Sequence, residues 1–350
     1  MLTDKEIREL VNEYGARVNE GRTIKQIIAD NDIPRLKGAT VLEGKVSDSV
    51  FGDSLKTRNG TPVRLMFRGN RISTHDVNRG AIPFKDQVLA QNHDHMLNLV
   101  KDILGSSQFE VAGLRPSSTV IPAENLNLIM LENVLRMYMA RSSTLTSLFQ
   151  HWLKAKEQNL GIFEYAGHKI HVNALTPDGQ LPYLMDTPST KEKVDRTIDP
   201  AFLIENGICT ADQYQHIRNA SLMAFGIISQ YLRDKGMVLV DTKTEHGINV
   251  NNEIVAADEL YTMDSSRFWK LNDDGSILEE DGKPVSFSKE FARGMVKDKG
   301  MQFSTEQSNE IAARYIAGLQ HLTGKSFEPD LRQRDQRIIE STNLIIDCLT

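Results

Sequence analysis

Two strand-like runs on either side of residue 251 constrain the fold of this 350-residue chain more than any other feature. MVLVDT begins at Met237 and EIVAADEL begins at Glu253, and both are rich in apolar and β-branched residues. The pair Asn251-Asn252 between them suits a two-residue turn, because asparagine tolerates positive φ better than most residues. The sequence therefore predicts a partly buried antiparallel hairpin.

The predicted turn also sets the register of the hairpin. A pairing of Val250 with Glu253 places Glu245 directly opposite Asp258, with Lys243 on the same face. Two carboxylates about 5 Å apart repel by roughly 3 kcal/mol at an effective dielectric constant near 20, which exceeds what a typical cross-strand pair contributes. Lys243 or a divalent cation can compensate, and hard oxygen ligands suit the Mg²⁺ of a nucleotide. A solvated pair on an exposed hairpin is the alternative interpretation.

Composition narrows the class of protein. The chain is 40% hydrophobic and 25% charged, which is sufficient for one large or two modest domains with a core. Its net charge of -6 comes without long runs of either sign, which argues against a nucleic-acid interface or a basic membrane patch. The N-terminus lacks a signal peptide, the apolar runs are too short to span a bilayer, and two cysteines fit a reducing compartment. We therefore expect a cytoplasmic protein that binds neither nucleic acid nor membrane.

Helical and strand patterns occur in clusters along the chain. Capping boxes at Thr3, Thr210 and Ser304 begin amphipathic helices, and a further helical period covers residues 88 to 104. Residues 186 to 200 are polar and aperiodic, which indicates a mobile surface loop. Strand patterns at residues 38–70 predict an antiparallel meander, and further strand patterns occur in FEVAGL, LNLIMLENVLRMYM and GHKIHVNAL. The pattern predicts an α+β fold.

Several residues are candidates for binding anions. EGKVSDS places Gly44 and Lys45 before a turn, where backbone N–H groups and an ammonium group can hold phosphate oxygens. An ordinary hairpin is the alternative, because the spacing of a P-loop is absent. Arg71, Arg136 and Arg267 could hold a second anion, with hydroxyl groups after Arg136, although a solvated loop is the alternative there.

Seven segments occur in order along the chain: VLEGKVSDS, RISTHDVNRGAIPFKDQVL, TPSTKEK, VLVDTKTEHG, EIVAADELYTMDSSRFW, VSFSKEFARGM and RYIAGLQHLTG. Together they resemble the SAICAR synthetase (phosphoribosylaminoimidazole-succinocarboxamide synthase) family over residues 40 to 325. The resemblance implies an ATP- and Mg²⁺-dependent ligase of de novo purine biosynthesis. Such an enzyme joins the ribonucleotide CAIR to L-aspartate through an acyl phosphate and releases SAICAR, ADP and phosphate. The implied fold has a small antiparallel β lobe packed on a larger mixed α/β lobe, with ATP in the cleft between them.

The resemblance also implies roles for individual residues by matching position. Lys45 and Lys243 would act in catalysis, and Glu245 and Asp258 would hold Mg²⁺. Nucleotide contacts would come from Gly44, Lys45, Val46, Ser47 and Glu132. Substrate contacts would come from Arg71, Ser73, Asp76, Arg136, Ser142, Lys191 and Arg267.

The same resemblance divides the chain into four parts. Residues 1–37 would be a helical N-terminal extension and residues 38–130 a β-rich ATP-binding lobe. Residues 131–325 would be the larger lobe with the Mg²⁺ and substrate sites, and residues 326–350 a helical tail. The role of the two terminal extensions is left open.

Three positions depart from the family pattern. Asn70 stands where an acid is usual, Ser47 where a base is usual, and His246 where an aromatic residue is usual. These departures leave two alternatives open: a ligase of the same fold for another carboxylate or amine, and a catalytically silent nucleotide-binding paralogue. Also open are the oligomeric state, a homo-oligomer included, the aspartate-binding residues, and the choice of serine after Arg136.

Overall fold

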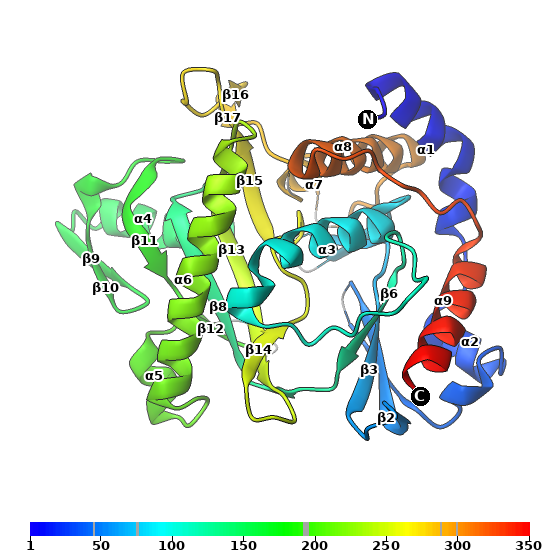
Figure 1. The fold of residues 1–350 in the computed structure, drawn as a ribbon. Coiled ribbons are helices and arrows are strands. Elements are labelled where there is room, and N and C mark those ends of the chain that lie inside the picture. Colours follow the sequence, from blue (N-terminus) through cyan, green and yellow to red (C-terminus); the bar gives the residue numbers. More distant parts are fainter. Residues whose placement is uncertain (45, 75–76, 192–195, 288, 299) are drawn as a thin grey trace. The chain divides into compact units, whose positions relative to one another are not determined.

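The chain divides into two units, each of which combines helices with antiparallel sheet. The computed structural model describes residues 1–44, 46–74, 77–191, 196–287, 289–298 and 300–350 (Figure 1). Unit 1 contains residues 1–95, 107–125 and 289–350, and unit 2 contains residues 96–106 and 126–288. The predicted α+β class is confirmed. The four-part division and the nucleotide cleft expected from the sequence stay predictions.

Unit 1 is built on a four-stranded antiparallel sheet in the order β1-β2-β3-β6. The strands are β1 (Thr40–Glu43), β2 (Asp48–Lys56), β3 (Pro62–Phe67) and β6 (Val120–Glu124). Strands β1 to β3 are consecutive in the chain, so the meander predicted for residues 38–70 is confirmed. A separate pair follows, formed by β4 (Arg71–Thr74) and β5 (Val77–Ala81).

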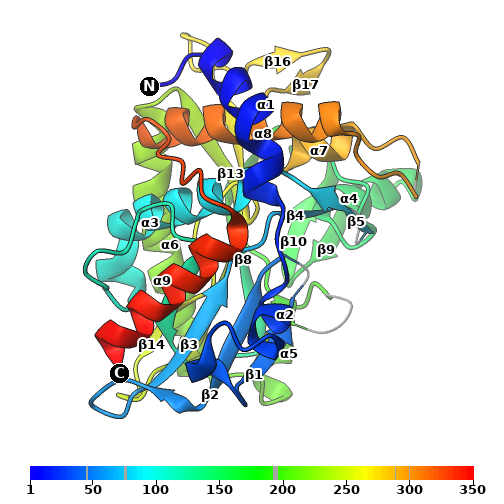
Figure 2. The same ribbon diagram turned by 90° about the vertical axis from the view of Figure 1, so that its right-hand side faces the viewer.

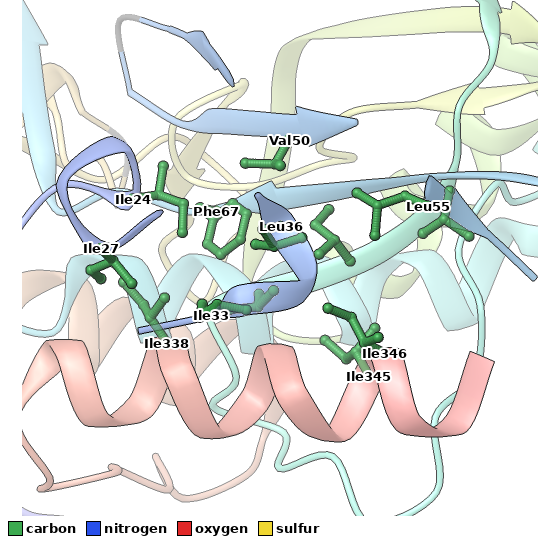
Figure 3. Packing of buried hydrophobic residues seen from close by; sticks show 13 residues of the cluster. Ile24, Ile27, Ile33, Leu36, Val50, Leu55, Phe67, Ile338, Ile345 and Ile346 are labelled. Carbon is green, nitrogen blue, oxygen red and sulfur yellow. The ribbon is translucent and has the colours of Figure 1, made fainter. Parts of the chain in front are cut away.

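Segments from both ends of the chain cover one face of this sheet. They are α2 (Ile24–Ala29), the 3₁₀ turn η1 (Pro34–Leu36) and α9 (Arg334–Leu349). Val63, Leu65 and Phe67 alternate along β3 and therefore share the face on which these segments pack. Figure 3 shows Phe67 beside Leu36 of η1. Figure 2 shows α9 lying over β2 and β3. The terminal extensions therefore supply the second layer of the unit 1 core.

The remaining helices of unit 1 follow the sequence prediction closely. Helix α1 (Asp4–Asn19) and helix α8 (Thr305–Thr323) begin with the predicted capping boxes at Thr3 and Ser304, and they pack on each other. The short α7 (Glu290–Gly294) precedes α8. Helix α3 (Lys85–Leu104) starts in unit 1 and ends in unit 2, and begins three residues before the predicted period.

One strand prediction in unit 1 is wrong. FEVAGL, residues 109–114, forms no strand in the described structure. Gly113 has φ of 80° within a turn, and the Phe109 N–H instead donates to the Pro122 carbonyl at 3.0 Å. A turn at residues 112 and 113 interrupts the ladder that the apolar residues of the segment favour.

Unit 2 contains a seven-stranded sheet centred on β13 (Met237–Ile248). Its other strands are β7 (Asn127–Leu128), β8 (Leu131–Tyr138), β11 (Gln180–Asp186), β12 (Ser189–Thr190), β14 (Ile254–Ala257) and β15 (Ser266–Lys270). Strand β13 pairs antiparallel with β7, β8, β14 and β15. Helix α6 (Ala211–Arg233), which begins with the predicted capping box at Thr210, packs along β13 and β8 (Figure 1).

Smaller elements complete unit 2. Helix α4 (Leu148–Glu157) packs against the hairpin β9 (Ile162–Tyr165) and β10 (His168–His171), which continues into η2 (Val172–Ala174). The others are α5 (Pro200–Glu205), β16 (Glu279–Glu280) and β17 (Lys283–Pro284). Among the described residues, none of the helices combines the length and apolar character needed to cross a membrane.

The predicted hairpin is present, but its predicted register is wrong by one residue. Ile248 pairs with Ile254, and Glu245 pairs with Ala257 rather than with Asp258. The loop has three residues instead of two: the Asn249 N–H donates to the Glu253 carbonyl at 3.0 Å. Asn252 takes the left-handed conformation with φ of 63°, which is typical of three-residue loops. Asp258 consequently lies just after β14, exposed and with φ of 57°.

The surface loop predicted for residues 186–200 is wrong at its beginning. Asp186, Thr187, Ser189 and Thr190 are buried, and β12 pairs with β8. The cause is the Asp186 carboxylate, which accepts hydrogen bonds from the Tyr214 hydroxyl at 2.9 Å and from Arg218 Nε at 2.8 Å. Residues 192–195 lie outside the described residues.

Candidate active site

Strand β13 places three charged residues on one face of the unit 2 sheet. Asp241, Lys243 and Glu245 are two residues apart, so their side chains point to the same side. Thr242, Thr244 and His246 alternate with them and are buried. Helix α6 covers the face that carries these three buried side chains, and His216 of α6 lies close enough to His246 to lower its pKa. The charged face is therefore the one available for chemistry.

A carboxylate does face Glu245 across a ladder, but the carboxylate is Glu132. Strand β8 pairs with β13 so that Thr244 lies opposite Asn133, and one further step of the same register brings Glu132 opposite Glu245. Lys243 joins the pair: its Nζ donates to Glu132 Oε1 at 2.5 Å and to Glu245 Oε1 at 3.5 Å. The compensating role predicted for Lys243 is thus seen, with a different acidic partner.

Two groups from the segment after β11 complete this cluster. Ser189 Oγ donates to Glu132 Oε2 at 3.2 Å, and Lys191 Nζ donates to Glu245 Oε2. Ser189 is buried beside Glu132 because the two residues are directly paired between β12 and β8. The segment that was expected to be a mobile loop therefore brings Lys191 to the predicted metal ligand.

The charges in the cluster influence one another strongly. Burial alone would lower the pKa of Lys243, but the negative charges of Glu132, Glu245 and Asp258 raise it well above its usual value. Burial would raise the pKa of Glu245, but Lys243 and Lys191 lower it. Three carboxylates thus face two ammonium groups, so these five residues carry one net negative charge at neutral pH. That excess favours the binding of a further cation.

The donor set fits Mg²⁺ held jointly with a nucleotide. Mg²⁺ usually takes one or two protein carboxylates and completes its octahedron with phosphate oxygens and water. Glu245 and Asp258 supply hard oxygen donors, and both act on the same Lys243. Within the described part of the chain, no group of three or more His, Cys, Asp or Glu side chains is arranged to enclose a metal ion. A site of this kind needs the phosphates as co-ligands.

A second charged row crosses three strands of the same sheet. Asp241 of β13 is paired with Arg136 of β8 on one side and with Arg267 of β15 on the other. Arg136 Nη1 donates to Asp241 Oδ2 at 2.8 Å, and Arg267 donates through Nε to Oδ1 at 2.9 Å and through Nη2 to Oδ2. Two guanidinium groups share one carboxylate, which leaves one net positive charge in the row. The structure therefore brings together two of the three arginines that were predicted to hold a second anion.

The environment of Arg136 also includes a residue that the sequence analysis missed. Arg136 Nε donates to Thr187 Oγ1 at 3.0 Å, and that hydroxyl donates to the Val134 carbonyl at 3.2 Å. Asp241 was missed as well, although its spacing from Lys243 and Glu245 carried a usable signal. No local signal identifies Thr187, because its contact depends on the pairing of distant strands.

Ser142 is not placed at this row by any observed contact. It lies between β8 and α4, where its Oγ accepts from the Thr144 N–H at 3.2 Å and its carbonyl accepts from Gln150 Nε2 at 2.7 Å. Its role as a phosphate ligand stays a prediction.

An anchor at Asp186 positions the segment that carries Ser189 and Lys191. Burial alone would raise the pKa of Asp186, but His168, Tyr214 and Arg218 hold it well below its usual range. The hydrogen bond to Asp186 in turn raises the pKa of His168. The segment is thereby tied to α6 and to β10 immediately before the site.

The other predicted site residues belong to unit 1. Gly44, Val46 and Ser47 lie in the β1–β2 connection, and Arg71 Nη2 donates to the Gly44 carbonyl at 3.1 Å. Ser73 lies in β4 opposite Asn78 and is half-buried. Two further predicted residues, Lys45 and Asp76, lie outside the described residues.

Comparison with known proteins identifies the fold and then the family. The SAICAR synthase from Saccharomyces cerevisiae, solved in complex with SAICAR, superimposes with a TM-score of 0.66 at 23% identity and covers 84% of this chain and 98% of its own. A SAICAR synthetase in complex with ADP gives a TM-score of 0.59 at 21% identity, with 83% and 100% covered. The fold is therefore that of the SAICAR synthases. Residues 42–309 match the family model of SAICAR synthetase, and the chain belongs to that family.

Named relatives agree with this membership. A putative phosphoribosylaminoimidazole-succinocarboxamide synthase 2 from Agrobacterium fabrum is 29% identical over 278 residues, which span 76% of this chain and 84% of the relative. The phosphoribosylaminoimidazole-succinocarboxamide synthase of Legionella pneumophila strain Lens is 29% identical over 298 residues, or 82% and 89%. The resemblance stated from the sequence is confirmed.

Proposed function

We propose that this protein is an ATP-dependent ligase of purine biosynthesis that joins CAIR to L-aspartate and releases SAICAR, ADP and phosphate. The observation that carries the proposal is the charged face of β13, in a chain whose residues 42–309 match the SAICAR synthetase family. The names of the relatives and the titles of the SAICAR and ADP complexes support the same substrates. We place the activity in the cytoplasm, where a reducing environment suits the free Cys209 and Cys348.

The proposed ligation requires stabilisation of negative charge on the phosphoryl group and no protein nucleophile. A carboxylate is a poor acyl donor, so ATP would convert it to an acyl phosphate, which the aspartate amine then attacks with loss of phosphate. Lys243 would face the transferring phosphoryl group, and Glu132 and Glu245 keep it protonated by raising its pKa. Its ammonium group would remain available as a fixed positive charge throughout the reaction.

Glu245 and Asp258 would hold Mg²⁺, which when bound would neutralise charge on the nucleotide phosphates. Lys191 already donates to Glu245 Oε2, so the ion and Lys191 would compete for that oxygen. Release of Lys191 would free an ammonium group for an acidic substrate. This assignment gives the predicted substrate role of Lys191 a physical basis.

Arg136 and Arg267 would bind the phosphate of the ribotide. Asp241 holds both guanidinium groups in place, and the row keeps a net positive charge that suits an anion. Ser142 would add a hydroxyl donor. Of the residues in unit 1, Gly44, Lys45, Val46 and Ser47 would contact the nucleotide, and Ser73 and Asp76 would contact substrate.

Incubation of the purified protein with ATP, Mg²⁺, CAIR and L-aspartate tests the proposal. We expect ADP and SAICAR to form in equal amounts, and omission of CAIR or aspartate to stop the formation of product. Absence of ADP in every combination would exclude a ligase, whereas turnover with CAIR that is indifferent to aspartate would point to another amine substrate.

Variants test the assignment of the metal ligands within the same assay. Glu245→Ala and Asp258→Ala are each expected to abolish turnover, because each removes a carboxylate from the proposed Mg²⁺ site. Asp273→Ala is the matched control, since Asp273 is an exposed acid of the same unit. Near-normal activity of Glu245→Ala or Asp258→Ala at low Mg²⁺ would contradict the assignment.

A further inference from the structure

The connection between β1 and β2 is held from both sides by one ion pair. Asp48 Oδ1 accepts from the Gly44 N–H at 3.3 Å and from Arg71 Nη2 at 2.7 Å. The same Arg71 Nη2 donates to the Gly44 carbonyl at 3.1 Å. Both polar groups of the Gly44 backbone are therefore bound by the Asp48–Arg71 pair, which we name the latch.

The backbone around the latch leaves no room for side chains at two glycines. A Cβ at Gly44 would lie 2.2 Å from the Ser47 carbonyl oxygen, and a Cβ at Gly69 would lie 2.1 Å from the Val46 carbonyl oxygen. Real Cβ atoms do not approach backbone oxygens so closely, so the carbonyl groups of Val46 and Ser47 have well-defined places. Val46 is thus packed tightly against Gly69, two residues before Arg71.

The burial of Asp48 makes its pairing with Arg71 necessary. Asp48 is 3% exposed, and a buried carboxylate without a partner would cost several kcal/mol. Arg71 also cancels the negative charge of Asp48, which would otherwise repel phosphate oxygens beside the connection. A carboxylate at a phosphate-binding turn is tolerable only when it is neutralised in this way.

We propose that Asp48 is a positioning residue for nucleotide binding and that Arg71 serves the same latch, instead of contacting substrate as the family resemblance implied. The inference rests on the proposed function, in which the β1–β2 connection contacts the nucleotide. The latch binds both polar groups of the Gly44 backbone and so fixes the start of that connection.

The test compares the binding of ADP to full-length variants by isothermal titration calorimetry. Asp48→Ala is expected to weaken ADP binding about tenfold, within the usual range of coupling between linked groups. Asp53→Ala is the matched control, because Asp53 is an exposed acid of the same strand. Asp48→Asn keeps an acceptor for the Gly44 N–H and is expected to restore part of the lost affinity; it also serves if Asp48→Ala fails to fold.

Steady-state kinetics separates the latch from a substrate contact. Arg71→Ala and Asp48→Ala should both raise KM for ATP, leave KM for CAIR within twofold, and lower kcat less than they raise KM for ATP. The double variant should lose no more affinity for ADP than the worse single variant, because both residues act through one connection.

Three results would overturn the inference. The first is that Asp48→Ala and Asp48→Asn both bind ADP with the same affinity as the control Asp53→Ala. Another is a rise in KM for CAIR that exceeds the rise for ATP in Arg71→Ala. A wild-type protein that binds no ADP would overturn the nucleotide part of the proposed function itself, and that failure is visible before any variant is made.

Discussion

Successive side chains of β13 point to opposite faces of the sheet, so the charged site residues lie on one face and the packed residues on the other. Asp241, Lys243 and Glu245 share the face of the charged rows, while His246 is buried on the opposite face. This separation follows from the period of a strand and could be predicted from the sequence. The partner of Lys243 could not, because Glu132 is 111 residues away and is brought opposite only by strand pairing.

The contact of Lys191 with Glu245 predicts competition with divalent cations. Lys191→Met should tighten the binding of Mn²⁺ to the nucleotide-free protein about tenfold, because it removes the ammonium group from Glu245 Oε2. Mn²⁺ titration followed by electron paramagnetic resonance measures this. Lys169→Met is the control, because Lys169 is an exposed lysine of the same unit, and it should leave the affinity for Mn²⁺ unchanged. Equal affinities in the two variants, or the same gain in a Glu245→Gln background, would contradict the competition.

His246 predicts a defined loss of stability in acid. Burial lowers the pKa of His246 to about 4, below the value near 6.5 of an unfolded histidine. The stability contributed by the neutral imidazole is complete above about pH 6.5 and falls as the pH drops toward 4. His246→Phe removes this titration, so between pH 7 and 5 its free energy of unfolding should fall about 2 kcal/mol less than that of the wild type.

Urea unfolding at pH 7 and pH 5 measures the effect of His246. His171→Gln is the control, because His171 is exposed on β10 and should keep the wild-type pH dependence. An identical pH dependence in His246→Phe and the wild type would show that His246 does not titrate in this range.

At the scale of elements, the two ends of the chain are structural parts of unit 1. The family match covers residues 42–309, so α2, η1 and α9 lie outside it. Their buried residues, among them Ile27, Leu36 and Ile345, nevertheless belong to one core cluster with residues of β2, β3 and β6 (Figure 3). Arg337 of α9 also donates to the Val18 carbonyl at 2.9 Å, which ties the tail to the end of α1. Without these segments an apolar sheet face would be exposed to water.

The packing of α9 predicts a large cost for truncating one of its side chains. Ile345 is 0% exposed, and Ile345→Ala should lower the free energy of unfolding by about 2–5 kcal/mol, because it leaves a cavity against the sheet. Urea unfolding measures the change. Cys348→Ala on the exposed side of the same helix is the control and should change stability by less than about 0.5 kcal/mol. A similar small effect from Ile345→Ala would mean that α9 does not support the core.

At the scale of the whole molecule, the proposed ligands should be visible as stabilisation. A ligand that binds only the folded state at about 100 times its dissociation constant raises the free energy of unfolding by about 2.7 kcal/mol. ADP with Mg²⁺ should therefore raise the melting temperature more than ADP alone. Glu245→Gln should lose the Mg²⁺-dependent part and keep the part due to ADP, because it changes a proposed metal ligand and leaves the β1–β2 connection intact.

Thermal unfolding monitored by circular dichroism measures both increments in one series. Asp273→Ala again serves as the control and should respond to Mg²⁺ as the wild type does. An unchanged Mg²⁺ increment in Glu245→Gln would contradict the role of Glu245 as a metal ligand.

The local features of this protein could be predicted from short stretches of its sequence. Capping boxes at Thr3, Thr210 and Ser304 each start a helix, because a cap is made by residues three positions apart. The hairpin around Asn251 and the charged face of β13 were likewise readable from local spacing. The family could also be identified from the sequence, because each of its motifs is a short contiguous segment.

The contacts between these local features depend on long-range pairing and could not be predicted from the sequence. A three-residue loop at residues 250–252, in place of two, moved Glu245 away from Asp258, and pairing with β8 then supplied Glu132 as its opposite carboxylate. The start of the predicted surface loop instead joins the sheet, where Asp186 accepts hydrogen bonds from Tyr214 and Arg218. Strand register and ion pairing between distant segments depend on contacts that no local pattern encodes, and at these points the sequence predictions had to be corrected.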